Sequence, residues 1–253
     1  MITMVEMELN IINMYPDILN MYGDIGNLIC IKQRAMWRGI KVNIQEITLS
    51  NETTKIDENT DMVLIGGGSD NGQTVVANNL LKQKQSVENY IENNGVLLAI
   101  CGSYQMFGQT YIDGDGNNIP CSEIFDIETI SQKERLIGDI VLKSNINLSK
   151  HHDLDTIIGF ENHGGRTYHK YDKLGTVEAG FGNNGKDEEE GMIYNNFIGS
   201  YLHGPLLPKN PHLADYMILK ALQNKYEIDS LEQLNDEIEI NAHKSRVNTI
   251  LTK

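Results

Sequence analysis

A cysteine near the middle of the chain lies where a nucleophile would be expected. Residues 96–100 are all apolar, as in a buried strand, and Cys101 follows them directly. A sharp turn from a strand into a helix exposes a nucleophile only where its neighbours are small, and Ala99, Gly102 and Ser103 meet that need. The amino terminus of the helix would favour the reactive thiolate. The alternative is an inert buried cysteine, but the small neighbours favour a nucleophile.

A run of three glycines can supply the hydrogen-bond donors that such a nucleophile needs. Gly66, Gly67 and Gly68 follow the apolar residues 62–65. A thiolate that attacks a carbonyl carbon leaves negative charge on the oxygen, and backbone N–H groups stabilise that charge where no side chain blocks their approach. We therefore expect the amides of Gly67 and Gly68 to form an oxyanion hole with that of Gly102. By itself, the run is equally compatible with a flexible turn.

Two histidines are candidates for the general base. His203 follows the apolar residues 197–202 and precedes a Gly-Pro turn, which predicts a position at the carboxyl end of a strand. His163 is the rival, in a glycine-rich stretch that is also compatible with substrate binding or a turn. A lone histidine is more often a surface or capping residue, but the combination with Cys101 favours His203.

The elements that must position these residues alternate between strands and helices in the first half of the chain. Periodicity predicts strands at 7–14, 41–47, 62–65 and 96–100 and helices at 24–37 and 74–93. Such alternation is typical of a parallel sheet, whose functional loops gather at the carboxyl ends of the strands. The glycine run and Cys101 both follow such ends.

The second half of the chain is richer in short strands. The pattern predicts strands at 137–142, 157–160, 192–194 and 197–202, and closing helices at 212–225 and 231–243, the latter capped by Ser230. No linker separates the halves. We therefore expect one domain over residues 1–253 with a continuous sheet, a core at about 7–225 and a helical extension at about 226–253.

Composition limits the class of protein. The chain has 253 residues, of which 40% are hydrophobic, and a net charge of −14, which disfavours nucleic acid as a partner. Its three cysteines are too scattered for a disulfide framework or a zinc site, so no metal is expected. Carboxylates near the N-terminus are unlike a signal peptide, and no apolar run reaches transmembrane length. We expect a cytoplasmic protein.

Several segments resemble one known family. The glycine run, Cys-Gly-x-Tyr-Gln at 101–105 and Tyr-Leu-His-Gly-Pro at 201–205 are similar to class I glutamine amidotransferases of the cobyric-acid-synthase-like branch. Within that branch, the segments 159–168 and 201–210 resemble the glutaminase subunits of lipid II isoglutaminyl synthases. The resemblance implies an α/β fold of three layers, flavodoxin-like, with a mostly parallel sheet flanked by helices and a nucleophile elbow.

The resemblance also implies roles for particular residues. Cys101 corresponds to the family nucleophile, which forms a glutamyl thioester, and His203 corresponds to its general base. Gln105 and Arg135 correspond to positions that hold L-glutamine. The planar guanidinium of an arginine suits the α-carboxylate of that substrate, because it donates two parallel hydrogen bonds.

One position departs from the wider family pattern. In that pattern a glutamate two residues after the histidine completes a triad, but Pro205 stands there in this chain. An imidazole that nothing orients is a poor base. We therefore expect another group to orient His203, either Glu161 of this chain or a residue of a partner. Asn162 and His163, beside Glu161, are further candidates for the site.

The resemblance implies that the chain is one subunit of a ligase. Amide formation requires an activated carboxylate, and the sequence contains no convincing ATP site: residues 180–186 match the start of a P-loop, but Asp187 replaces the magnesium-binding Ser or Thr. We expect no cofactor in this chain and ATP with Mg on a partner. The resemblance identifies that partner as a MurT-like synthetase of the Mur-ligase family, in a heterodimer.

The acceptor follows from the same resemblance. The partner would use ammonia from L-glutamine to amidate the α-carboxyl of D-glutamate in the lipid II stem peptide, a step of cell wall biosynthesis. Three alternatives remain open: a glutaminase subunit for another synthetase, such as one that modifies a corrin ring, a stand-alone cysteine amidase, and a silent binding module that keeps the fold.

Overall fold

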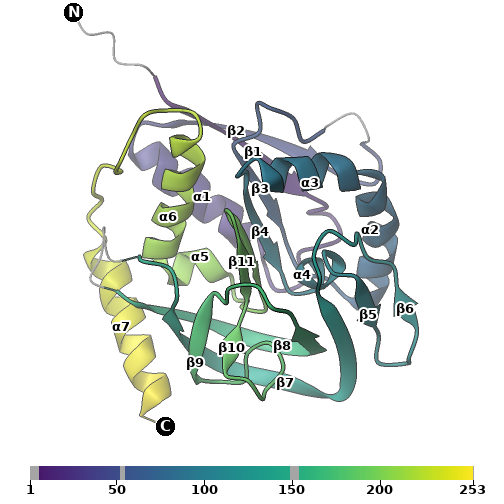
Figure 1. Cartoon of the computed structure of the whole chain (residues 1–253). Coiled ribbons are helices and arrows are strands. Elements are labelled where there is room, and N and C mark those ends of the chain that lie inside the picture. Colours follow the sequence, from purple (N-terminus) through teal and green to yellow (C-terminus); the bar gives the residue numbers. More distant parts are fainter. Residues whose placement is uncertain (1–5, 52–54, 149–153, 253) are drawn as a thin grey trace, which may run out of the picture.

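The computed structural model describes residues 6–51, 55–148 and 154–252. A first sheet has the strand order β11-β12-β4-β3-β1-β2 (Figure 1). Five strands run parallel and β11 pairs antiparallel with β12. The strands are β1 (Glu8–Met14), β2 (Lys41–Ile47), β3 (Met62–Ile65), β4 (Val96–Ile100), β11 (Met192–Tyr194) and β12 (Phe197–Ser200). The three-layer α/β expectation is confirmed for this half of the fold.

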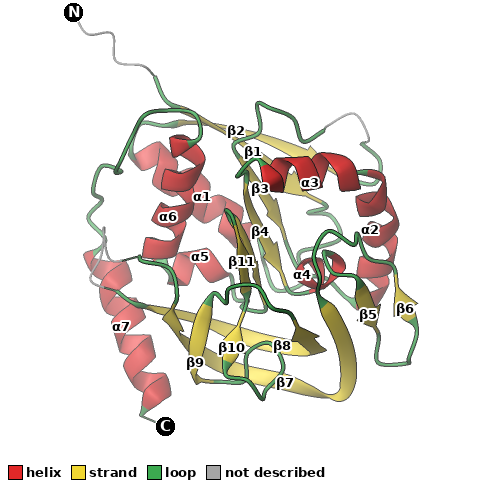
Figure 2. Cartoon of the chain, viewed as in Figure 1, coloured by secondary structure: helices red, strands yellow, loops and turns green. Residues whose placement is uncertain are grey.

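Helices cover both faces of this sheet (Figure 2). One face carries α1 (Ile25–Trp37), α5 (Leu206–Lys209) and α6 (Pro211–Gln223), and the other carries α2 (Asp70–Lys82), α3 (Lys84–Glu92) and α4 (Gly102–Met106). Because helices lie on both sides, β3 and β4 are buried along their whole length, which explains their uninterrupted apolar sequences. The helix expected at 74–93 is divided into α2 and α3 at Gln83.

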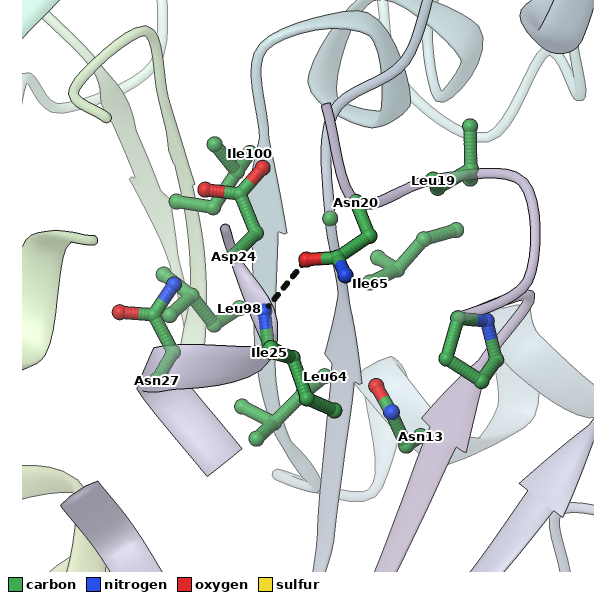
Figure 3. A pocket seen from close by; sticks show the side chains of 12 residues that line it. Asn13, Leu19, Asn20, Asp24, Ile25, Asn27, Leu64, Ile65, Leu98 and Ile100 are labelled. Carbon is green, nitrogen blue, oxygen red and sulfur yellow. Dashed lines mark hydrogen bonds between the residues drawn. The ribbon is translucent and has the colours of Figure 1, made fainter. Parts of the chain in front are cut away.

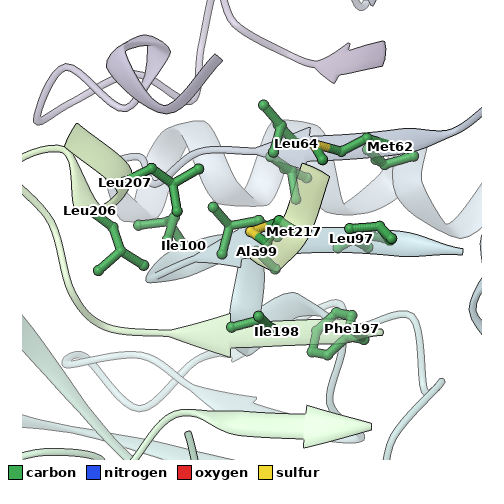
Figure 4. Packing of buried hydrophobic residues seen from close by; sticks show 14 of the residues in the cluster. Met62, Leu64, Leu97, Ala99, Ile100, Phe197, Ile198, Leu206, Leu207 and Met217 are labelled. Atoms are coloured by element: carbon green, nitrogen blue, oxygen red, sulfur yellow. The ribbon is translucent and has the colours of Figure 1, made fainter. Parts of the chain in front are cut away.

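The core between the layers brings together distant parts of the chain. Figure 4 shows Leu97 and Ala99 of β4 beside Phe197 and Ile198 of β12 and Met217 of α6. All five are buried. Burying a side chain of the size of leucine or phenylalanine contributes about 1.5–3 kcal/mol, so β12 is fixed beside β4 by packing as well as by its parallel register.

The expectation of one continuous sheet is wrong. A second sheet has the order β10-β9-β7-β5-β6, with β8 also paired to β7. Its strands are β5 (Thr110–Ile112), β6 (Asn118–Ile119), β7 (Glu128–Ser144), β8 (Thr156–Tyr168), β9 (Gly175–Ala179) and β10 (Glu189–Glu190). The long antiparallel β7–β8 pair uses its hydrogen bonds within this sheet, so isolated bridges, such as that between Phe160 and His203, link it to the first sheet.

The C-terminal helix begins later than the sequence predicts. α7 spans Glu237–Leu251, whereas residues 231–236 form neither helix nor strand and Ser230 caps no helix, so that expectation is wrong. Arg34 of α1 causes the difference, because its buried guanidinium pairs with Asp236 at 2.6 Å and with Asp215 of α6 at 2.7 Å. These contacts hold the approach to α7 against the body of the protein.

α7 packs on the second sheet. Val247 and Ile250 contact Val141 and Ile158 of β7 and β8. None of the helices in the described part of the chain combines the length and the apolar composition that a bilayer crossing requires. Residues 1–5, on which the expectation about a signal peptide partly depends, lie outside the described residues.

Candidate active site

A cleft of about 580 Å³ opens between the carboxyl edge of the first sheet and the second sheet. Its lining comes from both sheets and includes Tyr22, Gly68, Cys101, Gln105, Arg135 and His163. The carboxyl edge of a parallel sheet is where ligands of α/β proteins usually bind. The cleft is therefore the candidate active site.

Cys101 occupies a strained turn at the floor of this cleft. Its backbone has φ 55° and ψ −109°, a conformation that residues other than glycine rarely adopt. β4 ends at the preceding residue and α4 begins at the next one. The amide of Cys101 donates to the carbonyl oxygen of Ser200 at 2.7 Å, so neighbouring β12 holds the turn in place. This is the geometry of a nucleophile elbow.

The small residue after the nucleophile is required by packing. A Cβ on Gly102 would lie 2.1 Å from Nε2 of Gln73, a side chain that is itself buried. The amide of Gln73 is fixed there because its Nε2 donates to the carbonyl oxygen of Gly68 at 3.0 Å. Gly102 therefore leaves room for the Gln73 side chain next to the turn that carries the thiol.

His203 lies against the same glycine loop as Cys101. A Cβ on Gly67 would be 2.8 Å from Cε1 of His203 and 3.1 Å from Cβ of Cys101, so both side chains contact this glycine. The Tyr22 ring packs on the imidazole, with a centroid distance of 4.4 Å. Only 1% of His203 is exposed to solvent.

Asp24 orients the imidazole of His203. Nδ1 of His203 lies 3.4 Å from Oδ1 of Asp24. Burial by itself would lower the pKa of His203, but the negative charge of the Cys101 thiolate and the hydrogen bond to Asp24 raise it to about 10. The imidazole is therefore protonated at neutral pH and pairs with the carboxylate of Asp24.

Sequence reasoning missed Asp24 and assigned its role elsewhere. The residue precedes α1, in a position where its side chain would ordinarily cap the helix, yet it makes no capping hydrogen bond. Its Oδ2 instead accepts from the amide of Gly67 at 2.8 Å. The available signal was weak: an acidic residue in the loop after the first strand, at the same sheet edge as the glycine run.

A small cavity adjoins Asp24. Figure 3 shows the amides of Asn13 and Asn20 on its wall together with Asp24, and the amide of Ile25 donates to Oδ1 of Asn20 at 3.0 Å. Its volume of about 10 Å³ suits a single water molecule. Nδ2 of Asn13 is buried with no hydrogen-bond partner among the described residues, so such a water would have a polar partner there.

The hydrogen bond from the Gly67 amide to Asp24 changes the set of donors expected for the oxyanion hole. Because the Gly67 amide is engaged by Asp24, it is not free to stabilise an oxyanion. The amides of Gly68 and Gly102 donate to no acceptor within the described part of the chain. Gly102 follows Cys101 directly, and Gly68 lines the same cleft as Cys101. These two remain the candidate donors.

The expectation that Glu161 orients His203 is wrong. Its carboxylate accepts from the amides of Phe181 at 2.7 Å and Gly182 at 2.9 Å, and so fixes the turn that follows β9. Nε2 of His163 lies 3.7 Å from the same carboxylate. Glu161 therefore supports the wall of the cleft.

The contacts of His163 also argue against a role as the general base. Its Nδ1 donates to the carbonyl oxygen of Gly165 at 2.8 Å, and its ring stacks on Tyr201 at 3.6 Å. Burial lowers the pKa of His163, so this imidazole is neutral at neutral pH. Asp24 orients His203, whereas His163 forms part of the cleft wall.

Arg135 and Gln105 both line the cleft that contains Cys101. Arg135 lies at an irregular turn of β7, where Nε donates to Oδ1 of Asn162 at 2.7 Å and Nη2 to its carbonyl oxygen at 2.6 Å. The exposed guanidinium is thus aimed by Asn162 and accessible to a ligand. Gln105 is buried and donates to the Tyr201 hydroxyl at 3.0 Å. The structure therefore brings together the residues that the sequence singled out for substrate binding.

Comparison with known proteins agrees with this geometry. Residues 10–211 match the CobB/CobQ-like glutamine amidotransferase domain. The chain belongs to this family. A glutamine amidotransferase from Thermotoga maritima has the same fold, with a TM-score of 0.54 over 97% of this chain and 99% of that one at 13% identity.

Comparison with individual curated proteins shows which members of this family the chain is similar to. It is 44% identical to the GatD subunit of the glutamine-hydrolysing lipid II isoglutaminyl synthase of Staphylococcus aureus, over 86% of each chain. Identity to the GatD subunit of Streptococcus pneumoniae is 40%, over 88% of this chain and 84% of that one. A probable cobyric acid synthase of Methanococcus maripaludis is 31% identical over 58% of this chain and 30% of its own length.

Proposed function

We propose that this glutamine amidotransferase is the glutaminase subunit of a lipid II isoglutaminyl synthase. The observation that carries the proposal is Cys101 in its strained turn, beside an imidazole that Asp24 orients. The names of the Staphylococcus aureus and Streptococcus pneumoniae relatives support the choice of the complex. The grouping of Cys101, His203 and Asp24 at one sheet edge supports a catalytic role over a silent binding module.

In the first half of the reaction, Sγ of Cys101 attacks the side-chain amide carbon of L-glutamine. The amide carbon–oxygen π bond becomes an oxyanion, which the Gly68 and Gly102 amides stabilise. His203 gives its proton to the leaving nitrogen, the carbon–nitrogen bond breaks, and ammonia departs from the glutamyl thioester. Arg135 holds the α-carboxylate and Gln105 the adjoining part of the substrate.

In the second half, water releases glutamate from the thioester. His203, now neutral, takes a proton from the water as oxygen attacks the thioester carbon. The carbon–sulfur bond then breaks, which returns a thiolate beside an imidazolium. Asp24 stabilises the imidazolium in both steps and fixes which ring nitrogen carries the exchanging proton.

The ammonia must meet an activated carboxylate on another polypeptide. We assign ATP, Mg and the activation of the D-glutamate α-carboxyl of lipid II to a MurT-like synthetase of the Mur-ligase family, in a cytoplasmic heterodimer. Among the described residues, no group of three or more His, Cys, Asp or Glu side chains is arranged to hold a metal ion. The relatives are named as subunits, which supports a second chain.

The decisive experiment measures glutamate release from L-glutamine and amidation of lipid II. The chain is purified alone and with a Mur-ligase-like synthetase from the same genome, and each preparation is compared with its Cys101→Ala counterpart. Glutamate release that disappears in the variant, together with ATP-dependent amidation by the complex, supports the proposal. Amidation that proceeds equally well with Cys101→Ala and glutamine as the nitrogen source contradicts it.

A further inference from the structure

Glu190 is a carboxylic acid in the interior of the protein, behind the catalytic cleft. It ends β10 and is 0% exposed. No lysine, arginine or histidine of the described chain forms a salt bridge with it. Placing an ionised carboxylate in such an environment is costly unless a cation or several hydrogen bonds compensate. A residue of this kind therefore calls for a functional explanation.

The contacts of Glu190 converge on the strand end that supports the site. Its Oε1 accepts from the Ser200 hydroxyl and from the amide of Tyr201, each at 2.8 Å. Oγ of Ser200 in turn accepts from the amide of Leu202 at 3.1 Å. One carboxyl oxygen thus fixes three successive residues, immediately before His203.

The same three residues hold the reacting groups. The carbonyl oxygen of Ser200 accepts from the amide of Cys101 at 2.7 Å. The Tyr201 hydroxyl accepts from Gln105, and the imidazole follows Leu202 directly. Displacement of this segment would therefore move nucleophile, base and a substrate-binding side chain together.

The surroundings of Glu190 favour its neutral form. The Glu161 carboxylate of β8 and the Tyr104 hydroxyl of α4 both act on Glu190, and neither supplies positive charge. Its Oε2 and the Tyr104 hydroxyl are both buried with no hydrogen-bond partner in the described structure. Burial raises the pKa of Glu190 to about 8, despite the hydrogen bonds from Tyr201 and Ser200 that lower it.

We propose that Glu190 is a positioning residue for glutamine hydrolysis, which as a protonated carboxylic acid holds the Ser200–Leu202 segment and through it aligns Cys101 and His203. Ionisation would place a second negative charge near Glu161 in the interior, and the segment would shift to let water reach Glu190. This inference rests on the proposed glutaminase function.

The test compares Glu190→Gln, Glu190→Leu and the matched control Glu189→Gln. Glutamine resembles the protonated acid in shape and keeps an acceptor oxygen, whereas leucine removes it. Glu189 is the preceding residue, and its half-exposed carboxylate pairs with Lys173 at 3.1 Å. For each protein, kcat and KM for L-glutamine are measured from pH 6 to pH 10, with the partner synthetase present.

The wild type and Glu189→Gln should lose kcat as the pH rises through about 8. Glu190→Gln should retain most of the neutral-pH kcat and lack this decline, and Glu190→Leu should lose roughly 10²-fold in kcat at every pH, the scale of an ångström-sized misplacement. Equal pH profiles for wild type and Glu190→Gln would overturn the proposal. So would a folded Glu190→Gln protein with the loss expected of leucine.

Two further measurements separate this inference from the proposed function. The rate at which iodoacetamide alkylates Cys101 reports the alignment of the site without glutamine turnover, and it should show the same difference between wild type and Glu190→Gln. An infrared carbonyl band of a protonated carboxyl, present in the wild type at pH 7 and absent from Glu190→Gln, should identify the acid directly. Absence of that band from the wild type would overturn the proposal even if glutamine were hydrolysed normally or the variants failed to fold.

Discussion

Oδ1 of Asp24 lies 3.4 Å from Nδ1 of His203, although 179 residues separate them in the sequence. The other carboxylate oxygen accepts from the amide of Gly67. A single side chain thus orients the candidate base and fixes the loop on which that base and the nucleophile pack. The carboxylate stands in for the glutamate that Pro205 replaces after His203.

Asp24→Asn should therefore lower kcat for glutamine hydrolysis by about 10³- to 10⁴-fold, because an amide donor facing Nδ1 stabilises the wrong imidazole tautomer. KM should change little, since Asp24 lies behind the imidazole. Steady-state glutamate release measures both constants. Asp17→Asn is the control, an exposed acid of the same loop. A normal kcat for Asp24→Asn would remove Asp24 from the mechanism.

Cys101→Ala and Cys101→Gly should both abolish turnover, with a loss of at least about 10⁴-fold, because each removes the thiolate. Their stabilities should differ. Glycine accepts the φ of 55° without strain, whereas alanine does not, so the glycine variant should be the more stable by about 1 kcal/mol. Urea unfolding measures the difference. Equal stabilities would show that the turn relaxes once the thiol is removed.

Arg135→Lys should raise KM for L-glutamine by about 10- to 100-fold with a smaller change in kcat, because an ammonium cannot make the paired hydrogen bonds of a guanidinium to a carboxylate. Asn162, which aims Arg135, should hold lysine less well for the same reason. Lys143→Ala is the control on β7, since Lys143 pairs with exposed Asp155. An unchanged KM would place the α-carboxylate elsewhere in the cleft.

The ion pair between His203 and Asp24 should make the free energy of unfolding depend on pH. Its pKa is about 10 in the folded protein against an ordinary value of 6.5, so the folded state binds the proton more tightly. The stabilisation is then fully present below pH 6.5 and is lost as the pH rises through about 10. The difference in unfolding free energy between wild type and His203→Gln should shrink over this window. A difference that grows with pH would contradict the ion pair.

Much of the first sheet can be predicted from local sequence. The ranges 41–47, 62–65 and 96–100 match β2, β3 and β4 to the residue. β3 and β4 are predictable because buried parallel strands are short, apolar and bounded by glycine or polar residues. The elbow at Cys101 was equally predictable, since the space around the turn dictates small neighbours within a few positions of the nucleophile.

The features that the sequence did not predict depend on contacts between distant parts of the chain. Neither Asp24 nor the start of α7 is determined by its neighbours in the chain: His203 turns the first side chain away from helix capping, and Arg34 holds residues 231–236 in place. Periodicity likewise identifies strands without showing which strands pair, so two sheets were expected to be one. Long-range polar contacts decide these features, and they form only when the fold is complete.

The place of β12 has a consequence for synthesis on the ribosome. This strand is added beside β4 from a point about a hundred residues later in the chain, and it brings both the carbonyl oxygen that holds the Cys101 amide and the imidazole. A nascent chain that ends before residue 203 contains the thiol but lacks its partner. The thiol and its candidate base therefore come together only after residue 203 has been added to the chain.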